Sequence, residues 1–193
     1  MKTNSLSKLS IILLSISGIG LVISIFVPIW AIYLEAPQYP EGLGMFLHAN
    51  KITGDYEIIN GLNHYIGMKE IHQEDFWEFK ILPYALGFFA ALAFLTVFLN
   101  NKKWLYFFAA LFLIFGVAFM VDFYLWEYDY GHNLNPNAAI VVPGMSYQPP
   151  LFGFKQLLNF GAYSYPDIGG WIMFGVGIIL VVLSYLEIKS SNK

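Results

Sequence analysis

Four long apolar segments alternate with polar ones along the chain. The apolar segments are residues 9–34, 81–99, 104–126 and 168–188, and the first, Leu9 to Leu34, contains no charged residue. A helix rises about 1.5 Å per residue, so each segment has about the length needed to cross the ~30 Å hydrocarbon core of a bilayer. The pattern predicts a single all-α integral membrane domain, residues 1–193, with four transmembrane helices.

Two long loops, residues 35–80 and 127–167, separate these predicted spans. Apolar residues recur at spacings of three and four from Tyr56 to Phe79, which predicts a helix, although Gly61 and Gly67 each weaken it by about 1 kcal/mol relative to alanine. Residues 42–55 fit either a strand or a helix. The apolar stretch 151–160 is expected at the membrane surface. We expect the two loops to pack together as a small cap.

The placement of lysine predicts the orientation of the chain in the membrane. Six lysines fall on one side of a four-span topology: Lys2, Lys8, Lys102, Lys103, Lys189 and Lys193. Lysine-rich ends face the cytoplasm in membrane proteins. We therefore expect a bacterial inner-membrane protein with both termini cytoplasmic and both loops exoplasmic. Trp30 and Tyr33 are expected in the aromatic belt at the far end of the first span.

Composition agrees with a membrane protein and excludes several kinds of site. Hydrophobic residues make up 58% of the chain and charged residues 12%, whereas soluble proteins have about 25% charged residues. The absence of cysteine excludes disulfides, cysteine-ligated zinc and iron–sulfur clusters. The basic residues are all lysine, which argues against nucleic acid and nucleotide ligands because arginine is their usual partner. No catalytic triad, P-loop or dinucleotide-binding turn is present, so we expect no enzymatic activity.

Histidine and methionine residues gather in the two loops and suggest a metal site. His64, Met68 and His72 would form one stripe of a helix, at i, i+4 and i+8. Imidazole and thioether ligands suit copper, Cu(I) in particular. The sequence therefore predicts transient copper binding by these three residues, with further candidate ligands in the same loops: Met45, His48, His132 and Met145. The alternative interpretation is that these are ordinary residues of a wet, aromatic membrane interface.

Three stretches resemble a family of small four-span membrane proteins of Bacteroidota that are encoded beside nitrous-oxide reductase and its copper-maturation genes. The stretches are APQYPEGL at residues 36–43, INGLNHYIGM at 59–68 and PGMSYQPPLFG at 143–153. The resemblance implies a role in copper delivery to, or in the assembly and electron supply of, a periplasmic multicopper reductase, with maturation proteins as candidate partners. It points to His64, Met68 and Met145 as the residues of these stretches that could be ligands.

The sequence thus predicts a copper-handling accessory protein for nitrous-oxide respiration, in contact with the lipid bilayer. Two alternatives remain open. One is a scaffold or anchor that binds a periplasmic enzyme or an ABC-type complex and holds no metal. The other is a component of quinol-linked electron transfer, with Asp122 or His64 as the proton acceptor.

Overall fold

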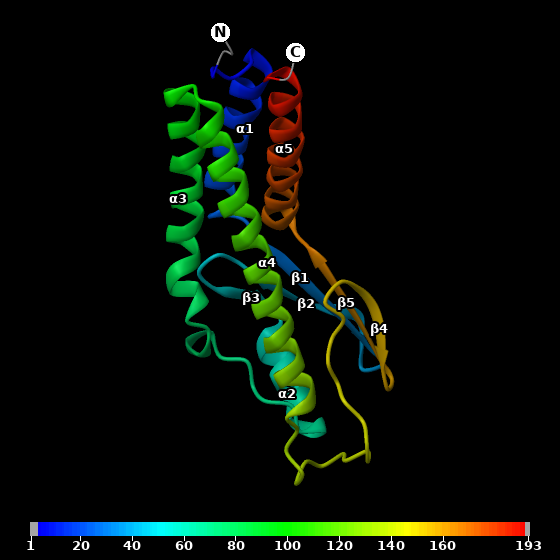
Figure 1. Cartoon of the computed structure of the whole chain (residues 1–193). Helices are drawn as coiled ribbons and strands as arrows, with labels where there is room; N and C mark the ends of the chain where they lie inside the picture. Colours follow the sequence, from blue (N-terminus) through cyan, green and yellow to red (C-terminus); the bar gives the residue numbers. More distant parts are fainter. Residues whose placement is uncertain (1–3, 192–193) are drawn as a thin grey trace.

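The computed structural model describes residues 4–191 of the chain. Four helices form a bundle at the end where the termini lie, and a sheet with a short helix lies at the other end (Figure 1). The helices are α1 (Lys8–Ser24), α2 (Tyr56–Ile66), α3 (Glu78–Leu99), α4 (Lys102–His132) and α5 (Ile168–Ser191), with a 3-10 turn at Gln73–Asp75. The strands are β1 (Trp30–Ala36), β2 (Tyr39–Leu47), β3 (Ile52–Gly54), β4 (Gly153–Leu157) and β5 (Phe160–Pro166).

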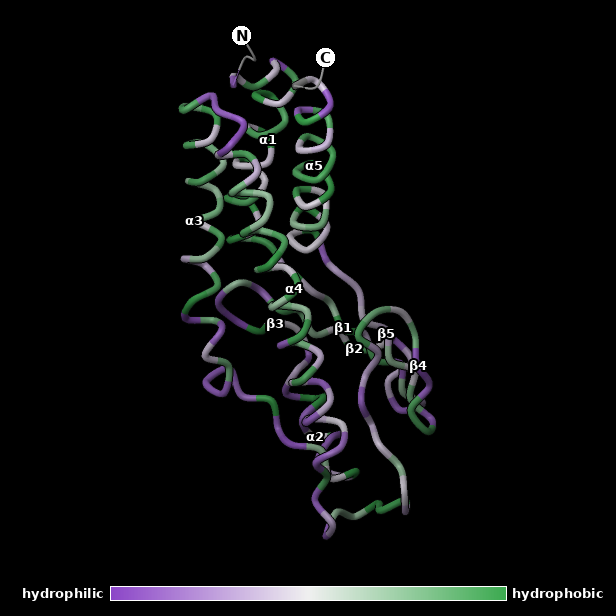
Figure 2. The backbone as a smooth tube through the Cα atoms, in the orientation of Figure 1, coloured by the Kyte–Doolittle hydropathy of each residue, from purple (hydrophilic) through white to green (hydrophobic). Residues whose placement is uncertain are grey.

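Three of the described helices are long and apolar enough to cross a membrane, judged by length and composition: α3, α4 and α5. The fourth helix of the bundle, α1, is apolar but has 17 residues. It packs against α3 and α5 through buried residues such as Leu14 and Leu21. Figure 2 shows the apolar helices and the more polar chain beyond them. The protein is therefore a membrane protein, with lipid-facing apolar helices as predicted.

The prediction of an all-α fold is wrong, because the first apolar segment is only partly helical. Helix α1 ends at Ser24, and the same segment re-enters regular structure at Trp30 as strand β1. A buried central strand is as apolar as a buried helix, so the continuous run from residue 9 to 34 hid the change. Trp30 and Tyr33, expected at the far end of the first span, consequently lie in strand β1.

The sheet joins the two predicted loops. Its five antiparallel strands have the order β3-β2-β1-β5-β4, so β1, at the end of the first apolar segment, pairs with β2 of the first loop and β5 of the second. The ambiguous region 42–55 forms most of β2 together with β3, and the stretch 151–160, expected at the membrane surface, includes β4. Alternate residues of the strands, such as Trp30, Ile32 and Met45, face α2 and the end of α4 and form a second core.

Helix α4 continues six residues beyond the predicted end of the third span, to His132. Its last turns lie against the sheet, where Phe123 meets Trp30 with ring centroids 5.3 Å apart. At its other end, Lys102, expected as a cytoplasmic surface charge, is 5% exposed. Lys2 and Lys193, also used to predict the orientation, lie outside the described residues. A groove of about 720 Å³ between α4 and α5 is lined by apolar and glycine residues and ends beneath the sheet at Trp30 and Leu151.

Candidate functional site

The predicted stripe of His64, Met68 and His72 does not form. Helix α2 ends at Ile66, because Gly67 adopts a left-handed conformation with φ of 79°. His64 remains exposed on α2, whereas Met68, just beyond the turn, is 8% exposed and points into the interior. His72 is exposed and lies 3.2 Å from Glu70. The prediction of one helix from Tyr56 to Phe79 is therefore wrong, and the three side chains do not share a helix face.

Three of the other predicted ligands, His48, His132 and Met145, lie on separate elements of the fold. His48 lies in the turn after β2, with its Nε2 2.9 Å from the Thr53 hydroxyl. His132, at the end of α4, donates through Nδ1 to the Tyr128 carbonyl at 2.9 Å and stacks on the Tyr128 ring. Met145 is half-buried against the second core. Within residues 4–191, no group of three or more His, Cys, Asp or Glu side chains could hold a metal ion.

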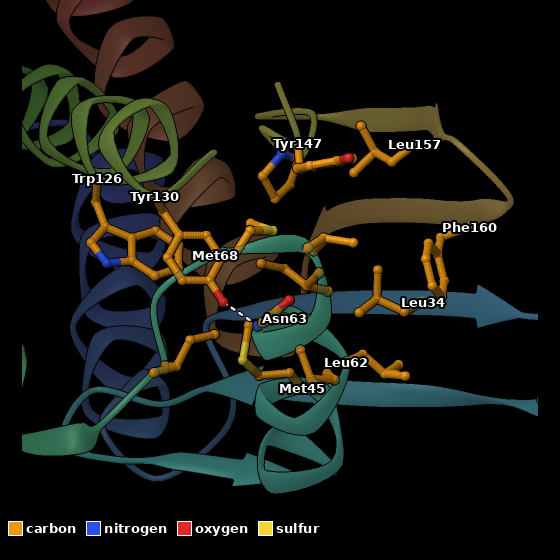
Figure 3. Close-up of a pocket in the computed structure, with 15 residues that line it drawn as sticks. Leu34, Met45, Leu62, Asn63, Met68, Trp126, Tyr130, Tyr147, Leu157 and Phe160 are labelled. Carbon is orange, nitrogen blue, oxygen red and sulfur yellow. Dashed lines mark hydrogen bonds between the residues drawn. The ribbon is translucent and has the colours of Figure 1, made fainter. Parts of the chain in front are cut away.

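Two of the predicted ligands, Met45 and Met68, do line a common cavity. This cavity, between α2, the end of α4 and the inner face of the sheet, has a volume of about 60 Å³. Its wall is almost wholly apolar, with Trp126 from α4 among the aromatic residues (Figure 3). Asn63 donates a short hydrogen bond to the Tyr130 hydroxyl inside this wall. The arrangement brings two thioethers near one space without a histidine.

The chain from Gly67 to His72 is held in place by a side chain that sequence reasoning did not single out. The Asn60 amide donates to the carbonyl of Ile71 at 3.0 Å and accepts from its N–H at 2.7 Å. These two buried hydrogen bonds resemble the paired backbone bonds between neighbouring strands, and they hold residues 67–72 against α2. In the sequence, the signal for this role was an amide residue, Asn60, among the apolar positions of the predicted helix.

The outer face of the sheet carries a set of aromatic side chains that we call the aromatic face. Along one row, Phe154 pairs with Tyr163 and Tyr163 with Tyr33, and the rings of Phe154 and Tyr163 lie 4.7 Å apart. Phe46 adds an edge contact to Tyr33 at 5.7 Å. The aromatic face continues toward α5 through three further rings in sequence: Tyr165, Phe152 and Trp171.

The aromatic face is exposed although it is apolar. Phe154 is 52% exposed, Tyr33 44% and Trp171 56%. Among the described strand residues, Glu35 is the one charged side chain that the register places on this face, and it accepts a hydrogen bond from the Tyr163 hydroxyl. Burial and the neighbouring Glu35 carboxylate raise the pKa of Tyr163. The period-two alternation of Tyr163 and Tyr165 with small buried residues could have revealed this face from the sequence.

Comparison with protein-family models, with curated proteins and with solved structures finds no match.

Proposed function

We propose that this protein is a membrane-anchored docking protein, whose sheet presents the aromatic face to an extracytoplasmic protein partner and which has no enzymatic activity of its own. The aromatic face is the observation that carries the proposal. Monomeric proteins rarely expose contiguous apolar patches beyond a few hundred Å², and such patches mark interaction sites. Tyrosine, tryptophan and phenylalanine are the residues enriched at the centres of protein interfaces.

Charge favours a protein over the bilayer as the occupant of the aromatic face. Surfaces that lie on anionic membranes carry clusters of lysine or arginine. The strands present Glu35 on this face, while Lys155 of β4 has the register of the opposite face. A partner with an apolar centre and a basic rim would complement this surface, because opposite charges at an interface rim steer association.

The topology that we propose places the sheet outside the cytoplasm. Helix α1 would span about 26 Å and complete a four-helix membrane bundle with α3, α4 and α5. Both termini and the α3–α4 turn lie at the end of the bundle opposite the sheet (Figure 1). Lys103 and Lys189 lie at that end and favour a cytoplasmic side in the inner membrane. Given the resemblance noted above, a periplasmic copper reductase and its maturation proteins are the first partners to test.

The experiment is site-specific photo-crosslinking in cells. A photoreactive phenylalanine analogue at position 154 or 33 should crosslink one protein through a surface that contains lysine or arginine. The same analogue at Tyr84, which is 78% exposed on α3, should crosslink lipid instead. Phe154→Ala/Tyr163→Ala should weaken the isolated complex about tenfold or more. Glu35→Lys should weaken it too, whereas Glu57→Lys on the exposed side of α2 should not.

Two outcomes would overturn the docking proposal. One is crosslinking of position 154 to lipid alone or to a second copy of the chain. The other is an affinity for the crosslinked protein that Phe154→Ala/Tyr163→Ala leaves unchanged.

A second candidate function, transient Cu(I) binding, has one observation in its favour: Met45 and Met68 line the same cavity. Thioethers stay neutral and suit Cu(I). A competition titration with a Cu(I) chelator should show binding that Met45→Leu/Met68→Leu removes, since leucine keeps the packing. His64→Ala/His72→Ala should retain binding. Absence of binding in the wild-type protein, or its loss in the histidine variant alone, would exclude a site of this kind.

A further inference from the structure

The contact between α4 and the segment at Tyr147–Gln148 encloses a carboxyl group without a partner. Glu127 is fully buried on α4, at 0% exposure, and neither of its carboxyl oxygens has a hydrogen-bond partner in the described part of the chain. Tyr147 is 2% exposed, and its hydroxyl also lacks a partner. Within residues 4–191, three of the four buried side-chain atoms without a partner belong to these two residues.

The surrounding chain explains how Glu127 is enclosed. The backbone N–H of Tyr147 donates to the Gly131 carbonyl at 2.8 Å, one helical turn beyond Glu127. A Cβ at Gly131 would lie 2.2 Å from the Cα of Gln148, so only glycine lets this segment lie directly on α4. Lys155 lies at the rim of the enclosure: its side chain is exposed, and its ammonium donates to the Gln148 carbonyl at 3.0 Å. Its charge acts on the Glu127 carboxyl.

A ligand that fits the buried Glu127 carboxyl group would be a cation that donates hydrogen bonds. An unpaired buried carboxylate costs several kcal/mol, so its complement is a group that brings both charge and N–H donors. Phe123 and Tyr130 share the buried stripe of α4 with Glu127, and aromatic rings also attract ammonium groups. One carboxylate supplies too few oxygens for Ca²⁺ or Mg²⁺, which take about six or more.

We propose that Glu127 anchors a binding site for a primary ammonium group, which enters beside Lys155 between β4 and the Tyr147–Gln148 segment. The Glu127 carboxylate accepts hydrogen bonds from the ammonium. The Gln148 carbonyl, which already accepts from Lys155, marks the entrance. This proposal is independent of the docking function, since it concerns the opposite side of the sheet from the aromatic face. A soluble amine and the head group of phosphatidylethanolamine both carry the required group.

The test uses the full chain in detergent, with ethylamine as the probe. Ethylamine should raise the melting temperature in a dose-dependent manner, while ethanol and tetramethylammonium at equal concentrations should not. Glu127→Gln should abolish the rise. Asp129→Asn, which removes an exposed carboxylate from the same helix, should retain it. A rise of equal size in Glu127→Gln, or no rise in the wild-type protein, would refute the site.

Infrared spectroscopy of the wild-type protein keeps the test decisive if Glu127→Gln does not fold. Ethylamine should remove the carbonyl band of a buried protonated carboxyl group and add a carboxylate band; unchanged spectra would refute the site. Measurements in nanodiscs of defined lipid then show whether the natural ammonium group comes from a lipid head group or from a soluble amine. The same spectral change in phosphatidylethanolamine without added amine, but not in phosphatidylglycerol, assigns the lipid head group. A change that requires added ethylamine assigns a soluble amine.

Discussion

His48, in the turn between β2 and β3, makes the stability of the folded protein depend on pH. Burial, followed by the nearby Lys51 ammonium, lowers the pKa of His48 below its ordinary value of 6.5, while Asp167 opposes this effect. The neutral ring is the form that fits the fold, and its Nε2 lies 2.9 Å from the Thr53 hydroxyl. The turn is therefore most stable when His48 carries no charge.

The sign of the pH effect follows from this lowered pKa. Well above pH 6.5 the ring is neutral in both the folded and the unfolded state, and it does not affect stability. As pH falls below 6.5, the unfolded chain binds a proton before the folded chain does, so stability is lost until pH passes the folded-state pKa. We predict that His48→Gln removes a small part of the acid-induced fall in melting temperature, on the order of 1 °C, between about pH 7 and pH 5. His64→Gln, an exposed control on α2, should melt like the wild type across this range.

At the scale of elements, the end of α2 decides which side chains can meet. The N–H groups of Gly67 and Met68 bond back to the carbonyls of His64 and Asn63, at 3.4 and 3.0 Å, which is the pattern of a helix closed by a left-handed glycine. The Gly67 carbonyl then accepts from the N–H of Asn135 at 2.8 Å. This glycine ends the helix and also lets the second loop approach it.

The two glycines of this region should respond in opposite ways to alanine. Gly67→Ala should destabilise the protein by about 1–3 kcal/mol, because its φ is 79° and a Cβ there would lie 2.8 Å from the Asn135 carbonyl oxygen. Gly61→Ala should be neutral or stabilise by up to about 1 kcal/mol, since it lies within α2 with nothing within 4 Å of an added Cβ. Chemical denaturation in mild detergent measures both. Equal effects would show that Gly67 is not a helix cap.

How far the elements could be predicted depends on what their sequences distinguish. Helices α3, α4 and α5 could be predicted from the sequence, because an unbroken apolar segment of about 20 residues is typical of a transmembrane helix. Strand β1 did not, because Trp30 to Leu34 continues an apolar helix without a polar break. The spacing of His64, Met68 and His72 matched a helix, yet Gly67 had been counted only as a weakness and not as a stop signal. The apolar cavity depends on contacts between α2, α4 and the sheet, and no local pattern encodes it.

At the scale of the whole molecule, a buried ion pair connects three helices at the end of the bundle opposite the sheet. The Lys102 ammonium at the start of α4 lies 3.1 Å from the Glu187 carboxylate near the end of α5, with side chains 6% and 3% exposed. The same carboxylate accepts from the Ser7 N–H at 2.8 Å and the Ser10 hydroxyl at 2.6 Å. Helices α1, α4 and α5 thus share one polar network at this end.

Breaking one side of this pair should cost far more than replacing both. Lys102→Met should destabilise the bundle by about 3–5 kcal/mol, because it leaves a buried carboxylate without its cation. Lys102→Met/Glu187→Leu should recover most of that loss, since an apolar pair of similar volume needs no charge compensation. Thermal melting of the purified variants measures both effects. A double variant as unstable as Lys102→Met would contradict the interpretation.

The central position of β1 in the sheet has a consequence for biogenesis. Trp30 of β1 and its hydrogen-bond partner Ser164 of β5 are separated by 134 residues. A ribosome therefore delivers β1 and β2 long before β5, and one edge of β1 stays unpaired while α3 and α4 are inserted. Unpaired strand edges recruit other strands. Because β5 leads almost directly into α5, the insertion of the last helix and the closure of the sheet become one event, and the nascent chain requires protection until then.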